Sequence, residues 1–396
     1  MRSRFLPRSP FAIVPALAAL LSLAAACTSA RRAPAAGPTT AASPRCAGVT
    51  VAEVPAERYE RAREMADEFA RAFRLPGAAF AVGAEGRIVW SHGVGWADVR
   101  ARRPACPGTR FRIGSVSKPL TAAGLMRLVQ AGRLDLDAPV RRYVPSWAAG
   151  EGDGPTLRQL AGHLGGIRHY RGDEEMSARR WGSVRESLAL FDADPPVAPP
   201  GERFHYSTYG YTLLSAAMEA AAGMEFTRWM RDSVFQPLGM TRTVPDSAGG
   251  RVPDRAAFYE ATASGGIVPA RPVDSSYKWA GGGYLSTVED LARFGLAHLR
   301  TGFLSAESLE QLFRSQRTVD GRPTGYGIGW YVPPEGRPAV AMHQGALLGG
   351  GAMLYIDRER GVVVAIAMNV KPDAPVPDTN PPPPPAFAQL FAHTGP

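Results

Sequence analysis

The apolar positions near the beginning of the chain follow first a helical and then a strand period. Residues 56–74 place apolar side chains on one face and charged side chains on the other, which predicts an amphipathic helix. Two short apolar runs follow at 77–84 and 87–94, separated by Glu85-Gly86, a dipeptide that suits a tight turn. These two runs are therefore predicted to form a hairpin of strands.

Helical spacing dominates the middle of the chain, and strand-like runs return near its end. The apolar run at 120–132 predicts a helix, and the region from about 133 to 300 is expected to be helical and rich in loops. Further helices of this region are expected at 156–163, 211–222 and 287–299. The late strands are expected at 326–332, 339–343, 352–357 and 362–369, the last two joined by a turn at 358–361.

Strands at both ends with helices between them indicate the fold class. An α/β chain of the α+β kind, with one mixed sheet built from both ends and a helical subdomain inserted in the middle, accounts for the pattern. This domain is expected over residues 55–370, and it contains no internal repeat. A proline-rich tail follows at 371–396, with a short helix expected at 387–393.

The beginning of the chain has the composition of a targeting segment followed by a tether. Three arginines precede an apolar run that is too short for a permanent membrane helix, which predicts a signal peptide over residues 1–26. Cys27 follows three alanines, as in the lipid-attachment site of bacterial lipoproteins, although the usual leucine lies one place early at Leu23. Lipidation of Cys27 and simple cleavage both remain open. Residues 27–54 are rich in Ala, Pro and Thr and predict a flexible tether.

Charge and hydropathy limit the cellular compartment and the binding partners that can be expected for this protein. Residues 1–50 carry six arginines and no acidic residue, so they supply most of the net charge of +9 and leave only +3 for the rest. The body of the chain has no Lys/Arg run of the kind that follows a phosphate backbone, so nucleic acid is not an expected partner. No second hydrophobic segment is long enough to span a membrane. The domain is expected to be exported, as a periplasmic or envelope lipoprotein or a secreted protein, with membrane contact only through its N-terminal anchor.

Cys46 and Cys106 are the two cysteines besides Cys27. Disulfides persist in exported proteins, so a bond between Cys46 and Cys106 is one expectation. Two unrelated small buried residues are the other, and the sequence leaves both open.

Lysine usage gives the first clue to chemistry. The chain holds three lysines, Lys118, Lys278 and Lys371, against 42 arginines. A guanidinium keeps its proton near neutral pH whereas an ammonium can lose one, so a lysine kept in such a chain suggests proton transfer. Lys118 follows Ser115 by three residues at a predicted helix start, where one helical turn brings both side chains to the same face. A neutral lysine there would be the base that a serine nucleophile needs.

A second Ser-x-x-Lys spacing exists at Ser275 and Lys278. It precedes the glycine triplet 281–283, where no helix is expected, and Lys278 is interpreted as a buried or loop-ordering residue. The triplet lacks the Gly-Lys-Ser/Thr of a phosphate-binding loop, and the chain has no Gly-x-Ser-x-Gly elbow of an α/β-hydrolase. Ser115 and Lys118 are therefore the preferred pair.

Three ordered motifs connect this pair to a known family. Residues 115–118 (Ser-Val-Ser-Lys), 206–208 (Tyr-Ser-Thr) and 343–345 (His-Gln-Gly) match a Ser-x-x-Lys helix start, a Tyr-x-Asn turn and a Lys/His-x-Gly strand. The chain resembles the serine β-lactamase and penicillin-binding peptidase family, especially its class C-like branch and the mitochondrial serine β-lactamase-like proteins with their bacterial relatives. The resemblance implies a β-lactamase/transpeptidase-like fold, in which helices flank an antiparallel sheet, and it implies no cofactor. Flanking matches lie at 160–170, 278–287 and 325–330.

The resemblance also implies roles for individual residues. Ser115 would attack a carbonyl and become acylated. Lys118 and Tyr206 would share its proton and pass one to the leaving group, the tyrosine being kept acidic by neighbouring cations. His343, in place of the family's alternative lysine, would orient the substrate or relay a proton. The backbone N–H groups of Ser115 and Ala346 would form the oxyanion hole.

Plainer interpretations of the same side chains stay open. Tyr206 also fits an aromatic wall of the core, and His343 also fits a hydrogen-bonded strand residue. His163 is interpreted as fixing a turn. Because His163 and His169 are six residues apart, a poor spacing for metal ligands on a helix, no metal site is expected.

Thr208 stands where the family has the asparagine of its Tyr-x-Asn turn, and it is expected, with Gly345, to contact the substrate. In relatives that asparagine meets the substrate's own amide, so its loss favours a peptidase or esterase over efficient penicillin hydrolysis. The expected activity is an acyl-enzyme hydrolase acting on small peptides, D-amino-acid amides or esters. One rival is a β-lactamase or D-Ala-D-Ala carboxypeptidase proper, and another is an inactive relative that binds cell-wall peptide or serves as a scaffold. The intact Ser115, Lys118 and Tyr206 argue against the inactive relative.

Overall fold

The computed structural model describes residues 44–148, 152–335, 339–371 and 383–392. The predicted signal peptide and the predicted lipidation of Cys27 fall outside these ranges and stay predictions. Within the described ranges, no helix is both long enough and apolar enough to cross a membrane.

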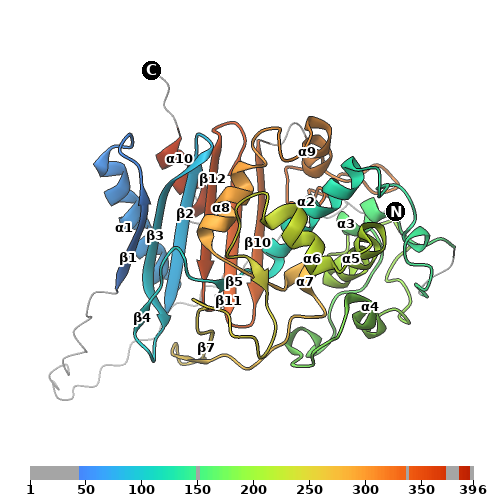
Figure 1. Ribbon diagram of the computed structural model, residues 1–396, viewed down its shortest axis with the longest axis horizontal. Coiled ribbons are helices and arrows are strands. Elements are labelled where there is room, and N and C mark those ends of the chain that lie inside the picture. The colour runs from blue at the N-terminus through green and yellow to red at the C-terminus, as the bar shows by residue number, and fades with distance from the viewer. Residues whose placement is uncertain (1–43, 149–151, 336–338, 372–382, 393–396) are drawn as a thin grey trace, which may run out of the picture. The chain divides into compact units, whose positions relative to one another are not determined.

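The main sheet has seven strands and takes them from both ends of the chain, as predicted (Figure 1). The N-terminal part supplies β1 (Arg45–Thr50), β2 (Gly77–Ala84), β3 (Arg87–Asp98) and β4 (Arg103–Pro104), and the C-terminal part supplies β10 (Val340–Leu347), β11 (Gly350–Asp357) and β12 (Val362–Met368). Their order is β1-β3-β2-β12-β11-β10, with β4 paired to β3, and every pair is antiparallel. β10 is thus the edge strand on one side of the sheet, which leaves one row of its backbone groups without a neighbouring strand in the sheet.

Two layers of helices cover the two faces of this sheet. Successive residues of a strand point to opposite faces, so Phe80 of β2 joins the core under α1 (Ala56–Ala72) and α10 (Pro383–Phe391), whereas Ala79 joins the core on the other face. On that other face α8 (Val288–Leu296) packs on β2 and β12. The packing is close: a Cβ on Gly295 would lie 2.4 Å from the Val363 side chain. Both faces are therefore dry, which is why every residue of β2 and β12 is buried.

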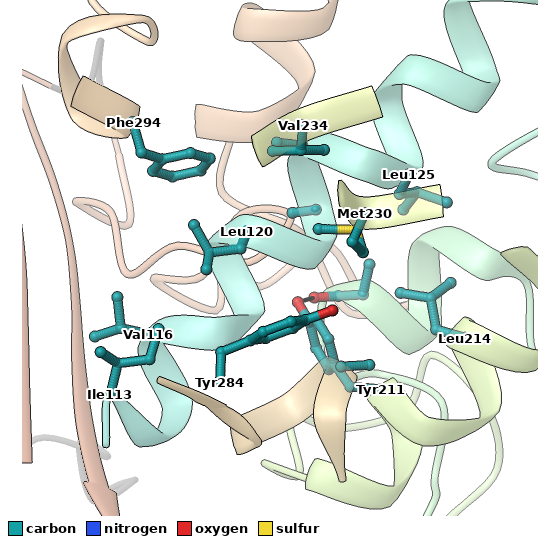
Figure 2. Close-up of a cluster of buried hydrophobic side chains, with 14 of the residues drawn as sticks. Ile113, Val116, Leu120, Leu125, Tyr211, Leu214, Met230, Val234, Tyr284 and Phe294 are labelled. Atoms are coloured by element: carbon teal, nitrogen blue, oxygen red, sulfur yellow. Dashed lines mark hydrogen bonds between the residues drawn. The ribbon is translucent and has the colours of Figure 1, made fainter. Parts of the chain in front are cut away.

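The inserted subdomain is helical, as predicted, and packs around α2 (Ser117–Gln130). Its core draws on Leu120 and Leu125 of α2, Leu214 of α5 and Met230 of α6, and it meets Phe294 of α8 (Figure 2). The other helices of this region are α3 (Leu157–Ala161), α4 (Val184–Ser187), α5 (Thr208–Ala222), α6 (Phe226–Met230), α7 (Trp279–Gly282) and α9 (Ala306–Phe313). The helix expected from residue 287 is present as α8, and it is capped at its start, since the Thr287 side chain accepts a hydrogen bond from the Asp290 backbone N–H.

Two small sheets complete the fold. One consists of β5 (Phe111–Arg112), β9 (Tyr284–Ser286) and β6 (Val244–Pro245), and the other is the hairpin of β7 (Tyr259–Ala261) and β8 (Ile267–Pro269). Strands of two or three residues are too short to show a hydrophobic period, so hydrophobic patterning does not predict them. β5 matters for the site because it leads directly into the turn that carries Ser115.

The strand predicted at 326–332 is wrong. These residues fold back on themselves, with an isolated bridge between Tyr326 and Tyr331 and a hydrogen bond from the Gly327 N–H to the Trp330 carbonyl (2.8 Å). Gly329 has φ +82, a conformation that L side chains rarely adopt. The alternation of aromatic residues and glycine imitates a strand, but its glycines serve a tight turn.

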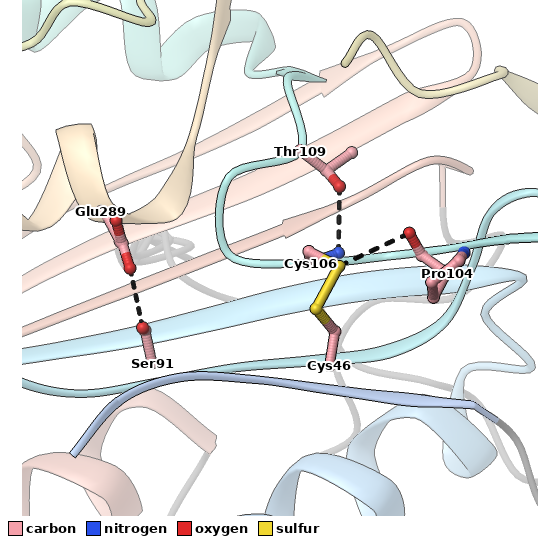
Figure 3. The surroundings of a disulfide bond; sticks show 6 residues. All are labelled: Cys46, Ser91, Pro104, Cys106, Thr109 and Glu289. Atoms are coloured by element: carbon pink, nitrogen blue, oxygen red, sulfur yellow. Dashed lines mark hydrogen bonds between the residues drawn. A yellow bond between two sulfur atoms is a disulfide. The ribbon is translucent and has the colours of Figure 1, made fainter.

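The predicted tether is wrong over its last part, because residues 45–50 form β1 and pair with β3. A disulfide joins Cys46 of this strand to Cys106, in the segment that leads to β5 (Figure 3). The Cys106 backbone N–H also donates to the Thr109 hydroxyl (3.0 Å), so the segment is fixed from both sides. The composition of 27–54 had suggested mobility, but pairing along β3 overrides composition once the disulfide holds the strand there.

The short helix expected in the tail exists as α10 and begins earlier than predicted. Phe387 and Phe391 of this helix are buried, and their rings lie against Trp90 of β3. The end of the described chain is therefore part of the core on the α1 face.

Candidate active site

Ser115 lies in a 3₁₀ turn, Gly114–Val116, that runs directly into α2. Gly114 has φ +49, and the Ser117 hydroxyl donates to its carbonyl (2.8 Å), which closes the turn. The preceding strand is held by a buried ion pair between Arg112 Nε and Asp246 Oδ2 (2.7 Å). The nucleophile candidate thus stands one turn ahead of the helix that the sequence predicted, on a segment fixed at both ends.

Lys118, in the first turn of α2, is fully buried beside Ser115. Its Nζ lies 3.1 Å from Ser115 Oγ, 3.1 Å from Thr208 Oγ1 and 2.6 Å from the Gly281 carbonyl oxygen. Burial, together with the charge of Lys278, holds the pKa of Lys118 well below its ordinary value. A neutral amine has two N–H donors and one lone pair, so donation to Gly281 and Thr208 leaves the lone pair for the Ser115 hydroxyl.

Tyr206 completes a close cluster with these two residues. Its phenol is close enough to the Ser115 hydroxyl for that hydroxyl to lower its pKa slightly, and Lys118 Nζ lies 4.6 Å from the centre of its ring. Burial raises the pKa of the Tyr206 phenol, and the nearby Ser115 hydroxyl only partly offsets this. The expectation that neighbouring cations keep this tyrosine acidic is therefore wrong, because the nearest amine is itself disposed to be neutral.

His343 of β10 has two hydrogen bonds inside the protein. Its Nδ1–H donates to the Gln344 carbonyl (2.7 Å), so its Nε2 is the acceptor for the Tyr326 hydroxyl (3.0 Å). Burial, followed by the charge of Lys118, lowers the pKa of His343 to about 3, so the ring is neutral at physiological pH. Its ring centre lies 6.4 Å from that of Tyr206. These are the contacts of a hydrogen-bonded strand residue that reaches the cluster through Tyr206.

The outer edge of β10 runs beside the Ser115 turn. Met342 exchanges backbone hydrogen bonds with Tyr331 (2.9 and 3.0 Å) on the side away from β11. Backbone groups alternate along a strand, so the N–H of Ala346 points to the same outer side. A Cβ on Gly345 would lie 2.9 Å from Ser115 N, which shows how closely the two backbones approach. The N–H groups of Ser115 and Ala346 therefore border the same space, as an oxyanion hole requires.

A cavity of about 310 Å³ opens onto this space. Of the catalytic and substrate-binding residues expected from the sequence, Ser115, Thr208, Gly345 and Ala346 line it, whereas Lys118, Tyr206 and His343 are not among its lining residues. The lining also includes His169, Tyr170, Glu175, Lys278, Gly281 and Gln344. The arrangement is a partly exposed hydroxyl at the base of a pocket with a buried amine behind it.

Lys278 is buried and orders a loop, as predicted. Its Nζ donates to the Glu175 carbonyl oxygen (2.7 Å), while the Ser275 hydroxyl is directed to Asp246 (3.5 Å). Burial lowers the pKa of Lys278 to about 8. The expectation of no helix here is wrong, because α7 makes one helical turn directly after Lys278. Glycine at 281 lets this turn pack closely against α5, since a Cβ there would lie 2.5 Å from Thr208 Cγ2.

Two histidines of the 160–170 segment hold the turn that carries Tyr206. His163, with φ +60, accepts the Ser207 N–H at Nδ1 (3.1 Å), and its carbonyl accepts the His205 N–H (2.8 Å). Its predicted role in fixing a turn is confirmed. His169 Nδ1 accepts the Thr208 N–H (3.3 Å).

Three contributors were missed from the sequence: the Gly281 carbonyl, the Tyr326 hydroxyl and the His169 ring. The first is a backbone group, which no side-chain pattern identifies. The other two lie in the flanking matches at 325–330 and 160–170, so those matches were the available signal. Among the residues that the structure describes, no group of three or more His, Cys, Asp or Glu is arranged to hold a metal ion.

Comparison with known proteins gives these motifs a wider setting. The sequence model of the family described as "Beta-lactamase" matches residues 62–382. The mitochondrial serine β-lactamase-like protein LACTB of Homo sapiens is 30% identical, over 80% of this chain and 77% of its own length. The octameric penicillin-binding protein homologue from Pyrococcus abyssi is similar at a TM-score of 0.69 and 26% identity, covering 84% of this chain and 76% of that one. The structure of SurE with D-Leu is similar at a TM-score of 0.64 and 26% identity, covering 80% and 72%.

Proposed function

The chain belongs to the β-lactamase family of serine hydrolases and has the β-lactamase/transpeptidase-like fold, and from this premise we propose that it is an exported peptidase or esterase. Its substrates would be small peptides, D-amino-acid amides or esters, each passing through an acyl-enzyme at Ser115. The observation that carries the proposal is the buried Lys118 amine, 3.1 Å from the Ser115 hydroxyl and disposed to be neutral.

Acylation would begin with attack of Ser115 Oγ on the substrate carbonyl. The hydroxyl proton passes to the lone pair of Lys118 as the new C–O bond forms. The negative charge that develops on the carbonyl oxygen is met by the N–H groups of Ser115 and Ala346. Lys118 then holds an extra proton in a buried site, which favours its rapid return to the leaving group.

Tyr206 is placed to carry that proton. Its phenol lies beside Ser115 and Lys118, and its raised pKa keeps it protonated, so it can donate to the leaving nitrogen or oxygen and be re-protonated by Lys118. Deacylation reverses the roles, because water attacks the ester carbonyl and the same amine and phenol receive and return the proton. His343 would act through Tyr206, by fixing the position of its ring.

The substrate preference rests on Thr208. Its hydroxyl lies 3.1 Å from Lys118 Nζ, so it serves the protein's own network rather than offering an amide to the substrate. This supports an ester or simple amide more than a penicillin. That the relative SurE was solved with D-Leu supports D-amino-acid derivatives as the compounds to test first.

Export is supported by the leader and by the disulfide. The chain begins with a basic, then apolar segment that ends beside Cys27, and Cys46 is bonded to Cys106. A bond of this kind persists in oxidising compartments. We therefore place the enzyme in the cell envelope or outside the cell, with small molecules or peptides as its partners.

The test treats the protein with a fluorophosphonate and, separately, with a fluorescent penicillin, and reads the intact mass. The expected result is one adduct per chain, abolished in Ser115→Ala and retained in Ser275→Ala. Ser275 is the matched control because it is the other serine three residues before a buried lysine.

The two probes also separate the rivals. A penicilloyl adduct that persists for hours supports a penicillin-binding peptidase, and one that is lost within seconds supports a β-lactamase. Turnover of D-amino-acid amides or short esters without a stable penicilloyl adduct supports the proposal. Failure of every acylating probe to label a folded protein would overturn it in favour of a binding or scaffold role.

A further inference from the structure

Exposed apolar and basic side chains gather at one end of the main sheet, in a region that we call the tip surface. It consists of Val99 to Arg102 in the β3–β4 turn, Ile267 and Val268 of β8, and Arg74 after α1. In the described part of the chain, five large hydrophobic side chains are exposed, and three of them are Val99 (37%), Ile267 (37%) and Val268 (46%). Single exposed apolar residues are ordinary, but three on one turn and the hairpin beside it call for an explanation.

The segments of the tip surface touch one another. The Val99 N–H donates to the Tyr259 hydroxyl of β7 (2.8 Å), which joins the β3–β4 turn to the β7–β8 hairpin. A Cβ on Gly265, in the turn of that hairpin, would lie 2.8 Å from Arg74 Nη1. Figure 1 shows β4 and β7 at the same end of the sheet. The tip surface is therefore one continuous region rather than three separate ones.

The charge of this region is positive. Arg74, Arg100 and Arg102 are exposed, and no ion pair within the described ranges involves any of them. The acidic residues of the same turns are few: Asp98 accepts the Ala101 N–H (2.9 Å), and Glu260 pairs with Arg271 (3.5 Å). Apolar side chains surrounded by arginines match a bilayer surface that carries negative headgroups.

The chain enters the fold beside this same region. The Pro44 carbonyl accepts the Gly95 N–H (2.9 Å), three residues before Asp98 at the end of β3. The apolar leader and Cys27 are thus covalently connected to the domain at its tip-surface end. Any attachment of the leader to a membrane raises the local concentration of the tip surface near the lipids.

We propose that the tip surface docks on an anionic phospholipid bilayer, with Val99, Ile267 and Val268 entering the headgroup region and the three arginines contacting lipid phosphates. This goes beyond the proposed hydrolase, since it sets how the domain stands on the membrane whatever its substrate. Because the attraction is electrostatic in part, it weakens as salt rises.

The test compares two exposed valines of the full chain. In a Cys27→Ser background, Val268→Cys and the distant Val319→Cys (76% exposed in the parent) are each labelled with an environment-sensitive dye, and the protein is bound to phosphatidylglycerol or phosphatidylcholine vesicles. The dye at 268 is expected to shift to the blue and to be quenched by spin-labelled lipid on phosphatidylglycerol alone. The dye at 319 is expected to stay in water on both.

A second variant checks the arginines. Arg74→Glu/Arg100→Glu/Arg102→Glu is expected to reduce quenching of the 268 dye at least about tenfold at 0.1 M salt, since each basic residue near an anionic surface contributes several-fold. Fluorophosphonate labelling equal to that of the parent shows that each variant is folded. Equal quenching at 268 and 319, or no protection of 268 on anionic vesicles, would overturn the proposal. Concentration-dependent protection of 268 without vesicles would overturn it in favour of contact with a second copy.

Discussion

The chain contains two Ser-x-x-Lys spacings, and the structure makes opposite use of them. At Ser115 the lysine amine faces the hydroxyl at 3.1 Å, because a 3₁₀ turn leads into α2 without a break. At Ser275 the side chains part: the serine is directed to Asp246, and Lys278 donates to the Glu175 carbonyl. Both lysines are buried, and burial lowers the pKa of both.

The difference teaches that spacing and burial together do not make a nucleophile. What distinguishes the first pair is the set of partners around its amine, since Gly281 and Thr208 take the two N–H groups and leave a lone pair for Ser115. The amine of Lys278 instead donates to the Glu175 carbonyl oxygen (2.7 Å), while the Ser275 hydroxyl is directed to Asp246. Four experiments sharpen this comparison, beginning with the largest effect.

Lys118→Arg against Lys278→Arg tests whether the first lysine must lose its proton. A guanidinium stays charged, so Lys118→Arg is expected to lower kcat/KM by about 10³-fold. Lys278→Arg keeps the charge that its site accommodates and is expected to lose less than about tenfold. Steady-state kinetics on an ester that the wild type hydrolyses, with circular dichroism to verify folding, decides the matter. Equal losses in the two variants would erase the distinction between the two spacings.

Gly345→Ala tests the close approach between the edge strand β10 and the Ser115 turn, a feature of the Ser115–Lys118 site. The new Cβ would lie 1.9 Å from the Ile113 carbonyl oxygen, so the strand must move away from the Ser115 turn. Displacement of one oxyanion donor is expected to lower kcat about 10²-fold. Gly108→Ala is the control, because its Cβ would meet nothing nearer than 3.6 Å. Full activity in Gly345→Ala would remove Ala346 from the proposed oxyanion hole.

Tyr326→Phe tests the hydrogen bond that holds His343 beside Tyr206. The proposed reaction gives no corresponding role to the residues around Lys278. Loss of the hydroxyl leaves His343 Nε2 a buried acceptor without its donor, and kcat is expected to fall about fivefold, with a stability loss of about 1–3 kcal/mol. A change in the ¹⁵N shift of His343 Nε2 would report the lost hydrogen bond. Tyr331→Phe is the matched control, since its ring lies 5.1 Å from the same imidazole. An identical outcome for both would reduce Tyr326 to packing.

Lys278→Met tests the smallest of the four effects, the electrostatic influence of Lys278 on the pKa of Lys118. Lys118 acts as a base only when neutral, so kcat/KM is expected to rise with pH as pH passes through the lowered pKa of Lys118. The charge of Lys278 is one cause of that lowered pKa, so its removal raises the pKa of Lys118 and moves this limb to higher pH. A loss of about threefold on the limb is expected, vanishing at high pH. A limb that stays in place or moves to lower pH would show that the two sites are not coupled.

The sequence predicted the parts of the fold in which local pattern and final environment agree. β2 was placed correctly, and α1 and β12 to within about two residues, because long apolar runs in a doubly covered sheet leave little ambiguity. β1 was missed because its place depends on β3 and on a disulfide partner 60 residues away. The 326–332 turn was mistaken for a strand because its glycines act through positive φ, which a hydrophobicity pattern does not record.

The residues of the candidate site also fall into those that the sequence predicted and those that it did not. The motifs gave Ser115, Lys118 and Tyr206, and the structure brings all three together. The Gly281 carbonyl was out of reach, since a backbone acceptor has no side-chain signature. The acidity expected of Tyr206 was wrong because it counted charges near the phenol without knowing that burial would favour the neutral amine and the neutral phenol alike.

The disulfide near the beginning of β1 has a mechanical consequence. A pull on the chain ahead of Arg45 reaches Cys46 after one residue, and from there the covalent bond transmits the load to Cys106, close to the base of β5. The remaining pairs of β1 with β3 are bypassed, so the strand does not peel from its free end, one hydrogen bond at a time. After reduction of this bond, the same pull would separate β1 from β3 one hydrogen bond at a time, beginning at the free end of the strand.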